Sequence, residues 1–182
     1  METRPPDNFD YFALAKKRRD QAQSYWKDIY ADFDTDMRLV AGDQWRTSDR
    51  AAREQAGRPA LQFNRQAQNV QMLVNTIRQN KPAIRVNPKS DSTVEEAKYF
   101  QGIIRHIEYA SQADMCRENA AEYSIGGGFG FYRITTEYAS DDSFDLDIFI
   151  RRIADPKTVL FDPNVMQPDF SDARWCQVWE YM

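Results

Sequence analysis

Four glycines in the stretch SIGGGFGFY, residues 124–132, are the residues whose type and spacing most suggest chemistry. A glycine-rich loop holds a phosphate when it follows a strand and opens a helix, because the helix N-terminus then faces the anion. Here a helical pattern precedes the glycines and a strand pattern follows them. Phe131 also occupies the place of the third glycine of a dinucleotide fingerprint, and no Gly-Lys-Ser or Gly-Lys-Thr follows. We therefore interpret Gly126 to Gly128 as a helix end in left-handed or extended backbone.

Such a turn lets the next strand leave close to the packed helices. Phe129 and Phe131, on either side of Gly130, are then expected to fill the interior. Aromatic faces can also stack on nucleic-acid bases, and that alternative stays open.

Other candidates for chemistry are weak. His106 is the only histidine, and it follows two isoleucines in a helical pattern, which favours a structural role over a nucleophile–base pair. An acidic group could bind Ca²⁺ or Mg²⁺, as a metal-dependent hydrolase would require, but it lacks the order and glycine of an EF-hand and is typical of a hairpin turn. We predict no catalytic residue, no metal or cofactor site, and no enzyme. The acidic group is Asp141, Asp142, Asp145 and Asp147.

The composition excludes several classes of protein. The chain has 182 residues, of which 42% are hydrophobic and 29% charged, and its net charge is −4. These values predict a folded protein, and the net charge argues against a dedicated nucleic-acid coat. Cys116 and Cys176 lie too far apart for a zinc motif and do not suggest a disulfide framework. No stretch approaches the roughly 20 apolar residues of a membrane span, which fits a cytosolic protein.

Charge is distributed unevenly along the chain. Residues 46–86 contain eight basic and two acidic side chains, whereas residues 134–172 contain nine acidic and three basic ones. Complementary patches of this kind can meet across a subunit interface, or they can lie on separate solvated faces. The arginines could also contact nucleic acid. The candidate contact residues are Arg46, Arg50, Arg53, Arg58, Arg65, Arg78 and Arg85.

The first two thirds of the chain have helical patterns. Apolar residues from Phe12 to Phe33 recur at spacings of three and four and predict one amphipathic helix. After a connector that contains Pro and Gly, Val70–Ile77 predicts a second helix. Pro82 ends that helix, and Ala83–Val86 is expected to form a short strand. Two further helices should follow, which start at a capping box, Ser92 with Glu95 or Thr93 with Glu96, and at Ser111 with Asp114.

The period of the pattern changes to two after the glycines. Tyr132–Tyr138 and Phe144–Ile150 alternate apolar and polar residues around the loop ASDDS, which predicts a β-hairpin. Short strands are also expected at Val159–Phe161 and Trp175–Tyr181. The predicted fold class is therefore α+β, with N-terminal amphipathic helices followed by a β-hairpin and further short antiparallel strands. We expect one lobe over residues 1–182, helical over 8–125 and mainly β over 129–182.

Seven strings, considered together, resemble the N-terminal portion of portal proteins from short-tailed, double-stranded DNA phages, the P22-like portal family. They follow one another in order over nearly the whole chain. Each string is weak alone, but the series is specific. The strings are AGDQW (41–45), GRPALQFNR (57–65), RQNKPAIRV (78–86), QGIIRHIEY (101–109), IGGGFGFYR (125–133), DSFDLDIFIRRI (142–153) and DPNVMQPDFSDARW (162–175).

The resemblance implies a structural subunit of a dodecameric ring at one vertex of the capsid. In that family the ring docks the packaging terminase, passes double-stranded DNA through its channel during packaging and ejection, and connects head to tail. The implied partners are further copies of the chain, terminase, DNA, and capsid, scaffolding and tail or head-completion proteins, without a membrane. The implied location is the virion, with assembly in the host cytoplasm.

The chain is much shorter than portal proteins, and its last strand pattern is still open at Met182. We therefore expect it to be a truncated form, most similar to the outer wing region of the family. Without the family's stem, clip and crown, no residue is assigned to DNA or terminase. A different function also stays open. A single-stranded nucleic-acid-binding module would use the arginines of residues 46–86 with Trp45, Phe63 and the aromatic residues of 129–132.

Overall fold

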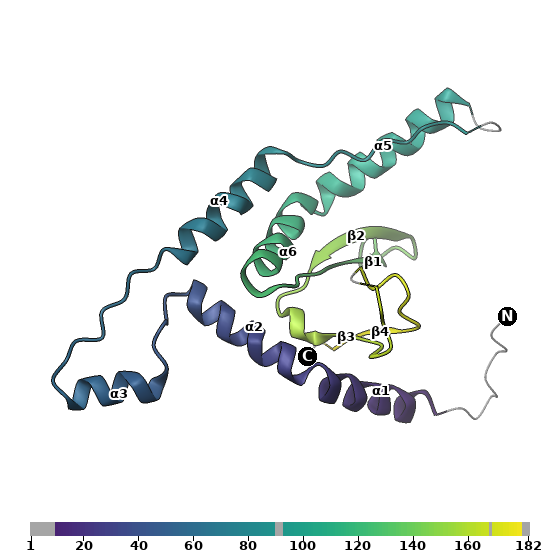
Figure 1. Ribbon diagram of the computed structural model, residues 1–182. Helices are drawn as coiled ribbons and strands as arrows, with labels where there is room; N and C mark the ends of the chain where they lie inside the picture. Colours follow the sequence, from purple (N-terminus) through teal and green to yellow (C-terminus); the bar gives the residue numbers. More distant parts are fainter. Residues whose placement is uncertain (1–9, 90–92, 168, 180–182) are drawn as a thin grey trace. The chain divides into compact units, whose positions relative to one another are not determined.

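The computed structural model describes residues 10–89, 93–167 and 169–179, and it has an α+β arrangement with the helices first (Figure 1). The chain divides into two compact units. One contains the chain up to Phe33 and from Lys157 onward, and the other contains Asp34–Pro156. The single lobe expected for residues 1–182 stays a prediction. The elements are α1 (Tyr11–Tyr25), α2 (Lys27–Val40), α3 (Thr47–Gln55), α4 (Gln66–Gln79), α5 (Val94–Ala110), α6 (Ala113–Gly127), β1 (Tyr132–Tyr138), β2 (Leu146–Arg152), a 3₁₀ turn (Pro156–Thr158), β3 (Val159–Phe161) and β4 (Cys176–Val178).

The first unit packs α1 beside the antiparallel pair of β3 and β4. The prediction of one continuous helix from Phe12 to Phe33 is wrong, because the helix is interrupted at Trp26 (φ −87°, ψ 5°). The indole Nε1 of Trp26 donates a hydrogen bond to the Phe161 carbonyl at 3.4 Å. Its ring also meets the edge of Phe170, which is stacked on Phe161 at 4.3 Å between centroids. The interruption therefore coincides with an aromatic contact to β3.

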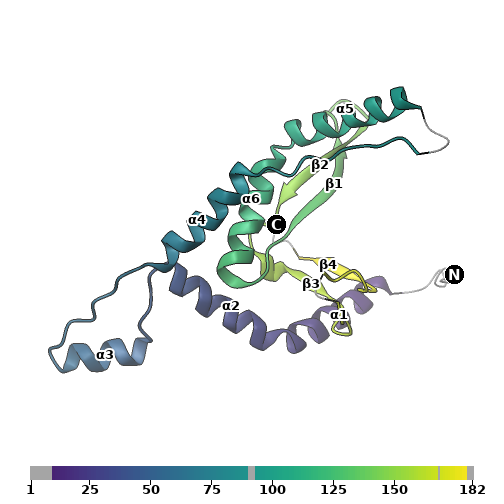
Figure 2. The same ribbon diagram turned by 45° about the horizontal axis from the view of Figure 1, so that its top comes forward.

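The second unit is held by helix packing. α4 lies on α6, α6 lies on β2, and α5 contacts both α6 and β2 (Figures 1 and 2). The buried apolar side chains of these four elements are mostly small, which allows helix backbones to approach their neighbours closely. They are Val70 and Val74 of α4, Ala97 of α5, Ala113, Cys116 and Ala120 of α6, and Ile150 of β2.

The glycine run ends α6 as predicted, although Gly126 and Gly127 are still helical. Gly128 takes the left-handed conformation (φ +96°) that residues with a side chain resist. Two residues later, a Cβ on Gly130 would lie 2.0 Å from the Ala120 carbonyl oxygen, so the chain passes directly against α6 before β1 begins. The strand therefore leaves close to the packed helices, as the sequence predicts. The helix also precedes the strand, which is the reverse of the order in a phosphate-binding loop.

The β-hairpin is also confirmed. β1 and β2 pair antiparallel, with Tyr132 opposite Arg152 and Tyr138 opposite Leu146. The predicted strand at Val159–Phe161 is confirmed as β3. β4 confirms the first part of the strand predicted at Trp175–Tyr181, whose last two residues, Glu180 and Tyr181, lie outside the described residues.

Three local predictions need correction. Ala83–Val86 forms no strand; instead the Gln101 side chain on α5 accepts from the Val86 amide at 2.8 Å and donates to the Ile84 carbonyl at 2.6 Å. The connector before α4 contains a helix, α3. α6 starts after Gln112 (φ +50°), because Ser111 belongs to the end of α5. By contrast, the capping box at Thr93 and Glu96 is confirmed, and Ser92 of the alternative box lies outside the described residues.

Candidate interaction surfaces

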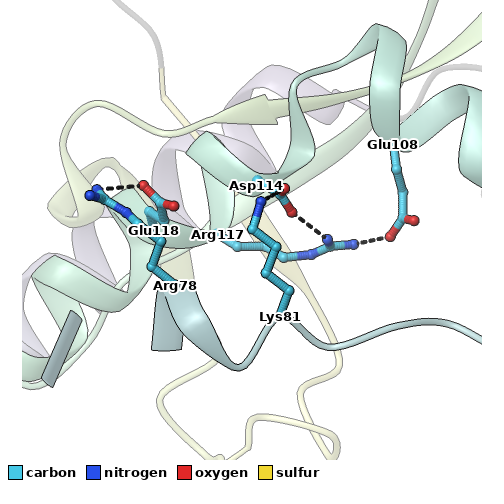
Figure 3. A network of polar contacts seen from close by, with 6 residues as sticks. All are labelled: Arg78, Lys81, Glu108, Asp114, Arg117 and Glu118. Atoms are coloured by element: carbon cyan, nitrogen blue, oxygen red, sulfur yellow. Dashed lines mark hydrogen bonds and ion pairs between the residues drawn. The ribbon is translucent and has the colours of Figure 1, made fainter. Parts of the chain in front are cut away.

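An ion-pair network connects α5, α6 and the chain that follows α4 (Figure 3). Arg117 on α6 contacts Glu108 on α5, and its Nη1 lies 3.5 Å from Asp114. The other oxygen of Asp114 accepts from Lys81 Nζ at 2.5 Å. Both Arg117 and Glu108 are more than three quarters buried as side chains, so water screens this pair less than a surface pair. The network fixes three chain segments against one another.

Arg78, one of the seven candidate contact arginines, belongs to the same region. Its Nη2 donates to Glu118 on α6 at 2.8 Å, and this hydrogen bond raises the pKa of the guanidinium. Burial is the largest single influence on Arg117 and acts against its charge, but the hydrogen bond to Glu108 and the attraction of the nearby negative groups together exceed it, so the pKa of Arg117 is raised too. Both arginines stay charged and paired, which is typical of structural ion pairs and not of proton transfer.

The chain between α2 and α4, residues 41–65, forms a projection around α3 that we name the arm (Figures 1 and 2). At its base, the Asn64 amide donates to the Val40 carbonyl at 2.8 Å. Asp43 there accepts from both Arg38 and Arg50 at 2.7 Å, and the hydrogen bond from Arg38 is the main cause of its lowered pKa. The arm is therefore closed at its base by polar contacts.

Across the arm, the Trp45 indole N–H donates to the Leu61 carbonyl at 3.1 Å. The Arg53 guanidinium lies 4.9 Å from the Trp45 ring centroid and also donates to the Pro59 carbonyl at 3.1 Å. These contacts hold α3 against the returning chain without covering Leu61 and Phe63, whose exposed fractions are 67% and 77%. The arm thus has a defined conformation with an open apolar side.

Five of the seven candidate arginines belong to the arm, whereas Arg78 and Arg85 lie outside it. Arg50 and Arg53 are engaged as described, and Arg78 is paired on α6. Four of the seven are exposed and form no ion pair within the described residues. These four are Arg46, Arg58 and Arg65 on the arm and Arg85 in the segment after α4. Their predicted role as subunit or nucleic-acid contacts stays a prediction.

The hairpin has its apolar face open, which is unusual for an antiparallel pair with one side on a core. On this face only Ile150 is buried, where its amide donates to Ser111 Oγ at 3.0 Å at the corner between α5 and α6. Towards the loop, large apolar side chains on the same face project into solvent. They are Ile134 (67% exposed), Tyr138 (65%), Leu146 (59%) and Ile148 (45%).

The opposite face of the hairpin is polar and more covered. Arg151 pairs with Glu137, with Arg151 Nη2 2.5 Å from Glu137 Oε2, and lies over the ring of the half-buried Phe149. The hydrogen bond from Arg151 is the main cause of the lowered pKa of Glu137. The usual distribution of polar and apolar faces is therefore reversed, and exposed apolar patches of this kind mark interaction sites.

Comparison with known proteins assigns the chain to a family. A model of the phage P22-like portal protein family matches residues 16–182. The chain belongs to this portal family. The portal protein of Acyrthosiphon pisum secondary endosymbiont phage 1 is 29% identical over 147 residues, which cover 75% of this chain and 20% of that protein. The chain thus spans about a fifth of the length of this relative. The portal family is structural and is not a family of enzymes.

The residues of this portal chain that could have done chemistry belong to different segments of the fold. His106 is exposed on α5, and Phe129 and Phe131 are half-buried, with ring centroids 5.9 Å apart. Ser143 Oγ bonds to the carboxylate and the amide of Asp145, as in a turn. Within residues 10–89, 93–167 and 169–179, no group of three or more His, Cys, Asp or Glu is placed to hold a metal ion. In the same ranges no helix has the length and apolar character to cross a membrane.

Two features of the portal chain were not predicted from its sequence. The open hairpin face had a visible signal, since Ile134, Leu146 and Ile148 alternate with polar residues, but alternation does not say which face is covered. The contact between Arg117 and Glu108 had no signal in the sequence, because it depends on how α5 and α6 pack against each other.

Proposed function

We propose that this chain is part of a portal subunit, repeated in a dodecameric ring at the unique vertex of a phage capsid. The ring would serve as the conduit for DNA packaging and ejection and as the docking site for terminase and tail. The observation that carries the proposal is the family match over residues 16–182, supported by the similarity to a portal protein. Closed cyclic symmetry with head-to-tail contacts is the geometry of such a ring.

The burial pattern supports an assembly function. Many of the large apolar side chains of the second unit are exposed, whereas small ones form most of its core. A subunit of this kind is expected to cover such side chains in contacts with other chains. The net charge of −4 is also compatible with a conduit, because a surface that bound phosphates tightly would hold the moving DNA.

The partners that we propose are further copies of the chain, terminase, double-stranded DNA in transit, and capsid, scaffolding, tail and head-completion proteins. The subunit would reside in the virion after assembly in the host cytoplasm, and it would perform no catalysis. We assign no cofactor, metal or catalytic residue to it.

The test is the assembly state of the complete protein. We expect negative-stain microscopy to show rings and sedimentation velocity to show one discrete large species. Monomers alone, at high concentration and low ionic strength, would count against the proposal. Sedimentation at increasing protein concentration separates specific rings, which keep one size, from aggregates, whose size continues to grow.

A single-stranded nucleic-acid-binding function is the second candidate. It is favoured by the position of Phe63, which is 77% exposed on the same arm as Arg46 and Arg58, two arginines that form no ion pair within the described part of the chain. Basic side chains around an aromatic ring are typical of backbone contact combined with base stacking. A gel-shift experiment with oligonucleotides tests it: binding should weaken steeply with added salt and with Phe63→Ala, and no shift at low salt would remove this candidate.

A further inference from the structure

We propose that the arm of one copy of this chain binds the open apolar face and the acidic loop of the hairpin of a second copy. This inference rests on the proposed function, because it names the surfaces through which neighbouring subunits of the ring would meet. The arm is residues 41–65, and the hairpin is β1, β2 and the loop between them.

The hairpin supplies an apolar centre with an acidic edge. Ile134, Tyr138, Leu146 and Ile148 form the open face, and Phe144 in the loop is 95% exposed. Between residues 134 and 150 the chain contains acidic side chains and no Lys or Arg. A complementary partner would therefore cover the apolar face of the hairpin with apolar side chains and place positive charges beside the acidic loop. The acidic side chains in or next to the loop are Asp141, Asp142, Asp145 and Asp147, whereas Glu137 is paired with Arg151 on the opposite face.

The arm supplies the complement. Leu61 and Phe63 are exposed on it, and Arg46, Arg58 and Arg65 are exposed and lack an ion pair within the described residues. The arm has a fixed conformation, because the Asn64 side chain is hydrogen-bonded to the Val40 carbonyl at its base and the Trp45 indole to the Leu61 carbonyl further along. It therefore presents these apolar and basic groups in a fixed arrangement. A preorganised surface loses little conformational entropy when it binds.

The two surfaces cannot meet within one chain. Both belong to the second compact unit, and Figures 1 and 2 show α3 at one end of this unit and the loop of the hairpin towards the other. A contact between two different patches at opposite ends of a subunit is heterologous, and repetition of such a contact produces a ring when the rotation closes. The arrangement thus favours head-to-tail assembly.

A second copy also fits better than other partners. Nucleic acid would suit the basic arm, but it would leave the apolar face and the acidic loop of the hairpin uncovered, because acidic side chains do not bind phosphates. A second copy satisfies both surfaces at once, since each copy carries one of each.

Charge reversal in the complete protein tests the proposal. One variant, R46E/R58E, makes the arm acidic, and the other, D141K/D142K, makes the hairpin loop basic. All four side chains are exposed on the surface, so both variants should fold, which circular dichroism and thermal unfolding check. Each variant alone brings like charges together, and we expect at least about a tenfold loss of rings by microscopy and sedimentation.

The decisive measurement is a 1:1 mixture of the two variants. In the mixture, each acidic arm can meet a basic loop, and each wild-type arm can meet a wild-type loop, so rings with alternating subunits should return. A matched control is K98E/R105E on α5, which changes the net charge equally and should keep its rings. The proposal falls if the mixture stays dissociated or if the control loses rings as well.

Other outcomes separate this inference from the proposed function. If the unaltered protein forms no rings, the proposed function fails. If it forms rings and both charge-reversed variants also do, only the interface assignment fails. Loss of oligonucleotide binding by R46E/R58E with intact rings would make the arm a nucleic-acid surface. A lower unfolding temperature of D141K/D142K with intact rings would mean that another segment of the same chain covers the hairpin.

Discussion

Two regions of the second unit use their side chains in opposite ways. Where α4, α5, α6 and the start of the hairpin meet, the buried residues are mostly small and the charges are paired, as Arg117 is with Glu108. In the arm and the hairpin loop, large apolar residues such as Phe63 and Phe144 are exposed, and several charges have no ion pair within the described residues. The first region stabilises the subunit, whereas the second offers surface to other molecules. Substitutions should therefore affect stability in the first region and association in the second.

The largest loss of stability is expected from Gly130→Ala. The added Cβ would lie 2.0 Å from the Ala120 carbonyl oxygen, so the backbone of α6 or of the following chain has to move. We expect a decrease of about 3 kcal/mol or more in the free energy of unfolding, measured by chemical denaturation. Gly102→Ala on α5 is the control and should stabilise slightly, because the added Cβ would meet no atom within 4 Å beyond the adjoining turns of its own helix. Equal effects of both substitutions would contradict the close approach.

Arg117→Ala is expected to cause the next largest loss of stability. It removes one partner of a mostly buried pair and leaves Glu108 without its cation, which should cost about 1–3 kcal/mol of unfolding free energy. Arg105→Ala, on an exposed part of α5, is the matched control and should change stability by less than about 0.5 kcal/mol. Unchanged stability of Arg117→Ala would show that the network of Figure 3 does not hold the helices together.

Thr93→Ala tests a local contribution. Thr93 Oγ1 accepts from the Glu96 amide at 3.2 Å, and the Glu96 carboxylate accepts from the Thr93 amide at 2.9 Å. Loss of this cap should cost about 1 kcal/mol and loosen the first turn of α5, which hydrogen exchange of its amides would show. Thr93→Ser retains the hydroxyl and should retain the protection. Equal exchange in both variants would argue against the capping box.

The smallest effect concerns pH and the hairpin. The pKa of Glu137 is lowered by its hydrogen bond from Arg151, so the contribution of this pair is present above the ordinary glutamate pKa and is lost as pH falls through the lowered pKa. In an acid titration followed by NMR, amides near the pair should shift only below the ordinary glutamate pKa. Glu137→Gln should abolish that transition. Titration of Glu137 at or above its ordinary pKa would refute the pairing.

Local chemistry in the sequence predicted much of the fold. The capping box at Thr93, the helix end at Gly128 and the alternation of Tyr132–Tyr138 each depend on neighbouring residues, and each is present in the structure. The failures depend on distant residues. Ala83–Val86 has the composition of a strand, but its backbone forms hydrogen bonds with the side chain of Gln101 and not with another strand.

The candidate surfaces were less predictable than the fold. The sequence showed that residues 46–86 are basic, but only the structure separates Arg78, which is paired on α6, from the exposed Arg46 and Arg58. Alternation identified an apolar face in the hairpin, and the sequence could not show that α5 and α6 cover it only near Ile150. Which side of an element is covered is a property of tertiary packing, and it lies outside the local pattern.

The contacts that close the arm have a consequence for the order of events during synthesis. All of them join residues between Arg38 and Asn64, so the segment needs no later part of the polypeptide to take its shape. Segments stabilised by near neighbours in the chain form quickly, and nascent proteins generally acquire structure from the N-terminal side. The arm can therefore be complete while the ribosome is still making the β-hairpin.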